Sequence, residues 1–147
     1  MGTVINFIQA YRAKTWSFEK KMLKEISLND LKKNIQSYFI DDLKDLTSNS
    51  FYAEQMCLEI AVEAFLLGAK YSRFGYFGEK KEYVTLRAQS ETSQLLETLK
   101  ECLYVGKEEN EMTIKERDNN LKCEFFIKRW WEEGFDRGAK RLKLRLK

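Results

Sequence analysis

Two residue types are missing from the 147-residue sequence, and each absence excludes something. There is no proline. Because proline marks loops, turns and edge strands, its absence favours long helices joined by short links. There is no histidine either, which removes the usual general base and the most common metal ligand of proteins. The two absences favour a helical protein and argue against metal sites built from cysteine and histidine.

Cysteines and long apolar runs are scarce as well. The three cysteines, Cys57, Cys102 and Cys123, are odd in number and form no CxxC pair, so they suit a reducing cytoplasm. With no histidine beside them, they are expected to be packed thiols rather than nucleophiles. The longest apolar stretch is far shorter than the roughly 20 residues that span a bilayer. No apolar segment follows a basic start, as it would in a signal peptide. We therefore expect a cytoplasmic protein with no transmembrane segment.

The residues that are present fit one helical domain. Apolar residues make up 44% of the chain and charged residues 33%. A chain of this length can bury roughly two-thirds of its unfolded surface in a single core. No linker divides it. We expect an all-α, single-domain bundle of about five helices over residues 1–147, in which residues 137–147 form a basic helix end.

Periodic apolar residues define the expected helices. The ranges are 4–22, 28 to the polar break "LTSNS" (46–50), 51–72, about 81–104, and about 119 onward. The last apolar stripe contains Leu121, Phe125, Phe135, Ala139 and Leu142. Leu28 lies on the expected buried side of the second helix, and Ser27 in "SLND" is placed to cap its start. The polar link 106–118 is the expected loop, with a small hairpin as the alternative.

The segment 51–72, "FYAEQMCLEIAVEAFLLGAKYS", is apolar around almost its whole circumference. A helix of this kind is typically surrounded by others. Only a narrow strip of Tyr52, Glu59, Glu63 and Lys70 is polar. We therefore expect this helix to be the centre of the bundle.

An internal similarity indicates where two helices meet. "EAFLLGAK" (63–70) and "EGFDRGAK" (133–140) share Glu, Phe, Gly, Ala and Lys at the same offsets. A glycine costs a helix about 1 kcal/mol relative to alanine, so a close approach of two backbones would have to compensate for it. We hypothesise that the two helices cross at Gly68 and Gly138.

The stretch "GAKYSRFGYFGE" (68–79) is rich in glycine and aromatic residues. Its glycine spacing fits no phosphate-binding loop, and it closes a helix instead of opening one. Its exposed members could stack on unpaired bases; this aromatic loop comprises Arg73, Phe74, Tyr76 and Phe77. The alternative, which we favour, is a helix end in which Gly75 is left-handed and Phe77 packs back on the helix.

Three segments carry a resemblance to a known family. They are "FEKKMLKEISLNDL", "VEAFLLGAKYSRFGYFGE" and "WWEEGFDRGAKRLKLRL". Together they resemble the YbaK-type proteins of bacilli, which are unrelated to the tRNA-editing deacylase of the same name. The resemblance is most specific around 62–79 and 130–146 and poorest from about 98 to 120. It implies a bacterial cytoplasmic protein of unknown function, and it transfers no catalytic residue.

Glu59 and Glu63 are weak candidates for catalysis. They lie one turn apart on the most apolar helix, where carboxylates can hold Mg²⁺ in a metal-dependent hydrolase. Such sites draw further acids from a second helix. Glu132, Glu133 and Asp136 would supply them only if they faced inward. We favour a solvated strip, and expect neither a metal nor a cofactor.

The strongest physical signal is the tail "RGAKRLKLRLK". From residue 137 onward the chain has bases and no acid, and on a helix these bases form a broad arc: Arg137, Lys140, Arg141, Lys143, Arg145 and Lys147. Such an arc suits nucleic acid or an anionic membrane surface, although no base-reading motif accompanies it. It is equally typical of a solvated helix end.

Trp130 and Trp131 complete the candidates. Neighbouring positions on a helix point about 100° apart. Trp131 fits the apolar stripe, which leaves Trp130 to face a partner. We expect a non-enzymatic interaction or regulatory protein that uses Trp130 and the basic tail to bind a protein partner or itself. Binding of nucleic acid or membrane through the tail, and carboxylate-dependent hydrolysis, are the alternatives.

Overall fold

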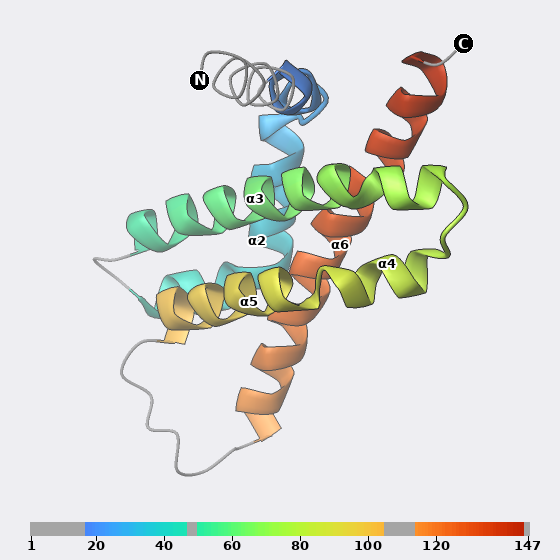
Figure 1. Cartoon of the computed structure of the whole chain (residues 1–147). Helices are drawn as coiled ribbons and strands as arrows, with labels where there is room; N and C mark the ends of the chain where they lie inside the picture. The colour runs from blue at the N-terminus through green and yellow to red at the C-terminus, as the bar shows by residue number, and fades with distance from the viewer. Residues whose placement is uncertain (1–16, 47–49, 105–113, 146–147) are drawn as a thin grey trace, which may run out of the picture.

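A computed structural model describes residues 17–46, 50–104 and 114–145, and all regular structure in these ranges is helical (Figure 1). Residues 17–23 are helical, and five helices follow: α2 (Leu28–Asp45), α3 (Ser50–Tyr76), α4 (Lys81–Arg87), α5 (Gln89–Tyr104) and α6 (Ile114–Arg145). The expected all-α fold is confirmed. The described ranges contain six helical segments where about five were expected. Residues 4–16 of the expected first helix, and 106–113 of the expected loop, lie outside the described ranges. Residues 114–118, which were expected to belong to the loop, are helical and begin α6.

The additional helix arises because the expected helix 81–104 is broken at Ala88. The backbone N–H of Ala88 donates to the carbonyl oxygens of Val84 and Leu86 and ends α4. Val84 and Ala88 are fully buried and pack with Trp131 in a small apolar cluster. Residues of α5 such as Leu99 belong to the main core instead. The break allows α4 to pack in the small cluster and α5 to pack in the main core. No proline or glycine marks the break in the sequence.

The start of α2 is as expected. Ser27 Oγ accepts a hydrogen bond from the backbone N–H of Asp30 at 3.3 Å, which satisfies one of the free amides of the first turn. The helix continues to Asp45 through an irregular backbone conformation at Phe39 (φ −128°, ψ 18°). Leu28, which was expected on the buried side, is 57% exposed.

Helices α3 and α6 cross with their backbones in close contact (Figure 1). A Cβ at Gly68 would overlap the carbonyl oxygen of Trp131, and a Cβ at Gly134 would overlap that of Phe65. The hypothesis of a close crossing at Gly68 is confirmed. Its counterpart on α6 is Gly134, which lies in the compared segment 133–140 but is not one of the shared residues, because Ala64 stands at the same offset in 63–70.

Gly138 lies one turn beyond this crossing point. A Cβ there would come within 2.5 Å of Ser72 Oγ and 3.0 Å of the Ala69 Cα. Ser72 is fully buried, and its hydroxyl donates to the Ala69 carbonyl oxygen at 2.5 Å. Gly138 therefore extends the close packing of the two helices, but it is not the point of closest approach.

The buried side of α6 is wider than the sequence pattern indicated. Leu121 and Phe125, expected on the core stripe, are 48% and 57% exposed. The main core takes other residues from this helix, namely Cys123, Phe126, Ile127 and Trp130. Phe126 packs edge-on against Phe39 of α2, with ring centroids 5.1 Å apart. Since α6 contacts α3 and α5, and also packs on α2 through Phe126 and Phe39, its buried residues do not form a single stripe.

The end of α3 lies one turn later than expected. The helix runs to Tyr76, and the residue with a left-handed backbone is Gly78 (φ 99°), not Gly75. A Cβ at Gly75 would overlap the Phe135 ring, so this glycine makes room for a side chain of α6. Phe77 is 79% exposed and does not pack back on the helix. The helix-end interpretation was correct, but its residues were wrong.

Candidate interaction surfaces

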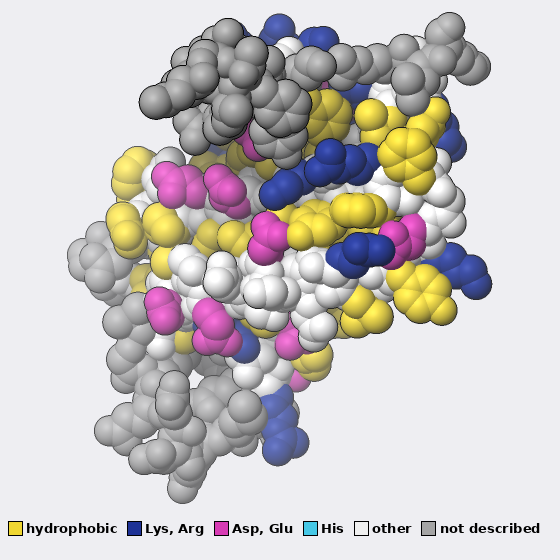
Figure 2. Space-filling view, viewed as in Figure 1, with side chains coloured by type: hydrophobic (Ala, Val, Ile, Leu, Met, Phe, Trp, Pro, Cys, Tyr) yellow, Lys and Arg dark blue, Asp and Glu magenta, His cyan; other side chains and the backbone are white. Residues whose placement is uncertain are grey.

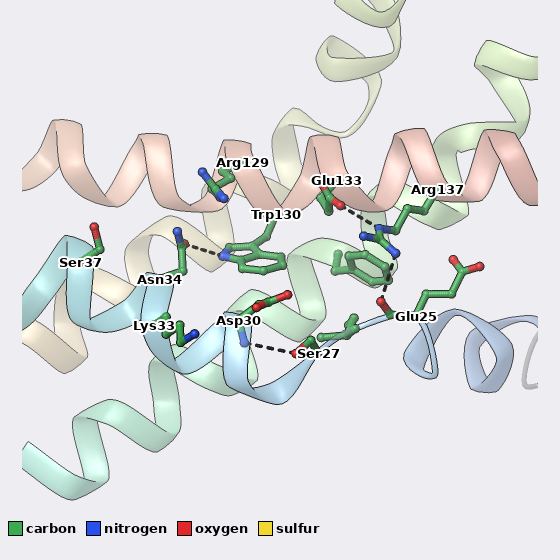
Figure 3. Close-up of a pocket in the computed structure, with 12 residues that line it drawn as sticks. Glu25, Ser27, Asp30, Lys33, Asn34, Ser37, Arg129, Trp130, Glu133 and Arg137 are labelled. Carbon is green, nitrogen blue, oxygen red and sulfur yellow. Dashed lines mark hydrogen bonds and ion pairs between the residues drawn. The ribbon is translucent and has the colours of Figure 1, made fainter.

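Trp130 lies in a cleft between the start of α2 and α6 (Figure 3). Its indole N–H donates to Asn34 Oδ1 at 3.0 Å, and only 7% of the residue is exposed. The expectation that Trp130 faces a partner is therefore wrong. Because α6 is enclosed on several sides, both adjacent tryptophans find a buried position, and Trp131 is 2% exposed.

The cleft beside Trp130 has a volume of about 400 Å³ and a mixed charge (Figure 3). Its charged residues are Glu25, Asp30, Lys33, Arg129, Glu133 and Arg137. Arg137 Nε donates to Glu133 Oε1 at 2.7 Å, and its Nη1 donates to the carbonyl oxygen of Glu25 at 3.2 Å. Since acids and bases alternate and pair, the cleft offers no field of one sign that would select an anion.

The described bases of the tail fall into two groups, those that contact Glu25 and those that are exposed to solvent without this contact. Arg141 Nη2 forms an ion pair with Glu25 Oε1 at 3.1 Å, so both Arg137 and Arg141 are tied to Glu25. Lys140 and Lys143 are exposed. The side chain of Arg145, and all of Lys147, lie outside the described part of the chain. The structure brings Arg137 and Trp130 into one cleft, where Arg137 pairs with Glu133 and Trp130 donates to Asn34 of the same chain.

Glu59 and Glu63 are exposed on α3. Two of the acids that could have completed a metal site have basic partners: Glu133 pairs with Arg137, and Asp136 Oδ1 lies 2.8 Å from Lys81 Nζ. The third, Glu132, is half-buried. Within the described ranges, no group of three cysteines or acids is arranged to hold a metal ion. The geometry agrees with the solvated strip that we favoured.

The three cysteines meet in one region of the core. Burial raises the pKa of Cys57 to about 12, and the neighbouring Cys102 and Cys123 add to this increase. Burial likewise raises the pKa of Cys123 to about 12, and it raises the pKa of Cys102. A thiol with such a pKa is protonated at neutral pH, and the thiolate is the reactive form. All three are free thiols, and their environment is that of packed side chains.

The surface that the sequence patterns missed lies on α4. Tyr83 and Leu86, one turn apart, are 58% and 63% exposed, and Figure 2 shows hydrophobic side chains over this helix. The guanidinium of Arg87 lies 4.7 Å from the ring centre of Phe74, and its Nε donates to Glu79 Oε1 at 2.7 Å. We call Tyr83, Leu86 and Arg87 the α4 surface. Its signal in the sequence was the i, i+3 spacing of Tyr83 and Leu86.

The aromatic loop contributes to the same end of the molecule. Phe77, 79% exposed, lies in the turn that leads from α3 into α4. The rings of Tyr76 and Phe77 meet edge-to-face with centroids 5.3 Å apart. Phe74 is half-buried beneath Arg87, so it stacks on protein and not on a free ligand. Of the four residues expected to stack on bases, Arg73 and Phe77 are exposed.

Comparisons with known proteins agree on one family. The whole chain, residues 1–147, matches the family described as "Protein of unknown function (DUF2521)". It is 29% identical over 153 residues to the "Uncharacterized protein YbaK" of Bacillus subtilis (strain 168), with all of both chains covered. No solved structure matches. Among the helices described, none has the length and apolar character needed to cross a membrane. The resemblance noted in the sequence is confirmed, and the chain belongs to the DUF2521 family.

Proposed function

We propose that the protein is a non-enzymatic cytoplasmic interaction protein that binds a protein partner through the α4 surface. The observation that carries the proposal is the exposure of Tyr83 and Leu86, at 58% and 63%, side by side on one short helix. Protein interfaces are enriched in aromatic residues and arginine, and the residues that dominate binding are often tyrosine, tryptophan and arginine. The α4 surface has this composition.

Arg87 supports the proposal through its fixed position. Its guanidinium is held between the Phe74 ring and the Glu79 carboxylate, at 4.7 Å and 2.7 Å respectively. A side chain that is already ordered loses little conformational entropy when a partner binds. Burying an exposed leucine or tyrosine adds roughly 1.5–3 kcal/mol per side chain. The α4 surface thus combines an ordered cation with apolar area that gains from being covered.

The alternatives have less support. Of the tail bases in the described part of the chain, Arg137 and Arg141 pair with acids of the protein itself, which leaves Lys140 and Lys143 for nucleic acid or membrane. Two lysines give only a weak attachment to either surface. Of the acids considered for hydrolysis, Glu59 and Glu63 are exposed, and Glu133 and Asp136 pair with bases of the chain.

Site-specific photocrosslinking tests the proposal. A photoreactive phenylalanine analogue is placed at Tyr83 and, as a matched control, at Phe125 on α6, since the two residues are 58% and 57% exposed. In cells, we expect discrete adducts with another protein from position 83 and none from position 125. Adding Leu86→Glu should remove the adducts while circular dichroism shows an unchanged fold. Equal adducts at both positions, or none at position 83, would contradict the proposal.

A further inference from the structure

One side of α3 remains uncovered along the whole helix. Residues at alternating spacings of three and four fall on one stripe of a helix. In chain order they are Tyr52, Gln55, Glu59, Glu63, Leu66, Lys70 and Arg73, all exposed except the half-buried Leu66. We call this set the α3 stripe. Figure 2 shows acidic side chains over the N-terminal half of α3 and basic side chains over its C-terminal half.

On the α3 stripe, acidic residues lie before Leu66 and basic residues lie at matching distances after it. Glu63 lies one turn before Leu66 and Lys70 one turn after it. Glu59 lies two turns before it and Arg73 two turns after. When the stripe is read from its other end, each acid is replaced by a base and each base by an acid. A surface with this property is complementary to a second copy of itself in the antiparallel orientation.

The charges of the stripe have no ion-pair partners among the described residues. Ion pairs occur nearby, for example between Arg87 and Glu79 and between Lys81 and Asp136, but none involves the stripe. Within the stripe, charges of like sign are neighbours: Glu59 with Glu63, and Lys70 with Arg73. Like charges at these spacings repel on a helix. An antiparallel second copy would offset each repulsion by placing charges of the opposite sign beside each pair.

We infer that two copies of the chain form a dimer by antiparallel pairing of their α3 helices about a two-fold axis at Leu66. Glu63 of one copy then faces Lys70 of the other, Glu59 faces Arg73, and symmetry doubles both contacts. Leu66 meets its own equivalent at the axis. With 27 residues, α3 is about 40 Å long, so the contact can extend along much of the molecule. Nothing in the proposed contact of α4 requires this dimer.

The charge order decides between a second copy and an unrelated partner. Binding of an unrelated partner would not require the two halves of the α3 stripe to match each other. In this stripe the charges of the two halves are matched in position and opposite in sign, as pairing with a second copy requires. Exposed ion pairs individually contribute little and weaken in salt. The dimer is therefore expected to be reversible and to dissociate as the ionic strength rises beyond about 0.1 M, where the Debye length is roughly 10 Å.

Charge-reversal variants of the full chain test the inference by sedimentation velocity at low salt. Glu59→Lys/Glu63→Lys makes the stripe wholly positive, and Lys70→Glu/Arg73→Glu makes it wholly negative. We expect the parent to be a dimer and each variant to be a monomer, because like charges now face one another. Mixed in equal amounts, the two variants should recover the dimer. Since all four residues are exposed, circular dichroism should show that both variants fold.

A matched control changes charge elsewhere. Glu101→Lys/Glu124→Lys alters two exposed acids outside the stripe by the same amount and should leave the dimer intact. The inference is overturned if the parent is a monomer at all concentrations, which would leave the stripe to another partner. It is equally overturned if the reversal variants remain dimeric, or if their mixture does not associate. Because none of these variants touches Tyr83 or Leu86, the crosslinking experiment on α4 gives a separate answer.

Discussion

Trp130 and Trp131 are both buried, yet they differ in hydrogen bonding. The indole N–H of Trp130 donates to Asn34 Oδ1 at 3.0 Å. The Nε1 of Trp131 has no hydrogen-bond partner among the described residues, although only 2% of the residue is exposed. A buried donor without a partner costs about 1–3 kcal/mol. The two neighbouring residues therefore contribute to stability in different ways.

This difference predicts unequal effects of one conservative change. Trp130→Phe removes a hydrogen bond and leaves Asn34 Oδ1 unsatisfied, whereas Trp131→Phe removes an unsatisfied donor. Because the loss of ring volume is the same, we expect Trp130→Phe to lower the free energy of unfolding by about 1–2 kcal/mol more than Trp131→Phe. Urea denaturation followed by circular dichroism measures both. Equal losses would show that the hydrogen bond to Asn34 contributes nothing.

At the residue scale, the sequence predicted the environment of Trp131 and not that of Trp130. A single apolar stripe describes a helix that is covered on one side. Since α6 contacts α3 and α5 and also touches α2, a residue outside the stripe can be buried by another neighbour, here α2 through Asn34. The exposed Phe125 and Leu121 are the converse case. Which sides of a helix are covered depends on the packing of the whole bundle, and this packing is not encoded in local periodicity.

At the scale of elements, the crossing of α3 and α6 depends on two positions without side chains. A Cβ at Gly134 would overlap the carbonyl oxygen of Phe65, and backbone atoms cannot move aside as a flexible side chain can. We expect Gly134→Ala to cost about 3 kcal/mol, the upper part of the usual range for overpacking. Urea denaturation measures the change.

Gly75→Ala is the matched control for this prediction. The added Cβ would overlap the tip of the Phe135 ring, and a ring can shift. Alanine also gains about 1 kcal/mol of helix propensity over glycine. We expect a loss of less than 1 kcal/mol. If Gly134→Ala were as stable as Gly75→Ala, the two helices would not be in backbone contact.

Local signals predicted some element boundaries and missed others. The cap at Ser27 follows from residues within one turn, and its hydrogen bond to Asp30 is present. The glycine that ends α3 is Gly78, not Gly75, because Gly75 faces Phe135 from a helix far along the chain. The break at Ala88 likewise depends on its burial beside Trp131. Boundaries fixed by distant residues were therefore out of reach of the sequence patterns.

At the scale of the whole molecule, the buried thiols make stability depend on pH. The pKa of Cys57 and that of Cys123 are both raised by burial from 9.0 to about 12. The folded chain then keeps protons that the unfolded chain releases. The contribution of the two thiols to the free energy of unfolding is complete below about pH 9. It is lost as the pH rises toward 12, by up to about 1.4 kcal/mol per pH unit for each thiol.

Denaturation at several pH values measures this dependence. Between about pH 8 and pH 10, the free energy of unfolding should fall for the parent protein. The decline should be shallower for Cys57→Ala/Cys123→Ala, which lacks both thiols, even though the variant is less stable overall. Parallel curves for the two proteins would mean that the cysteines are not shielded from water.

The glycine crossing also has a consequence for natural variation. At Gly68 and Gly134, every other amino acid places an atom where a carbonyl oxygen of the opposite helix lies, and no single change on the other side makes room for it. Substitution is therefore blocked at these two sites. At Gly138 the conflict is milder, because a Cβ would meet the Ser72 hydroxyl at 2.5 Å and the Ala69 Cα at 3.0 Å. As more members of the family are sequenced, positions 68 and 134 should stay glycine even where the surrounding residues diverge.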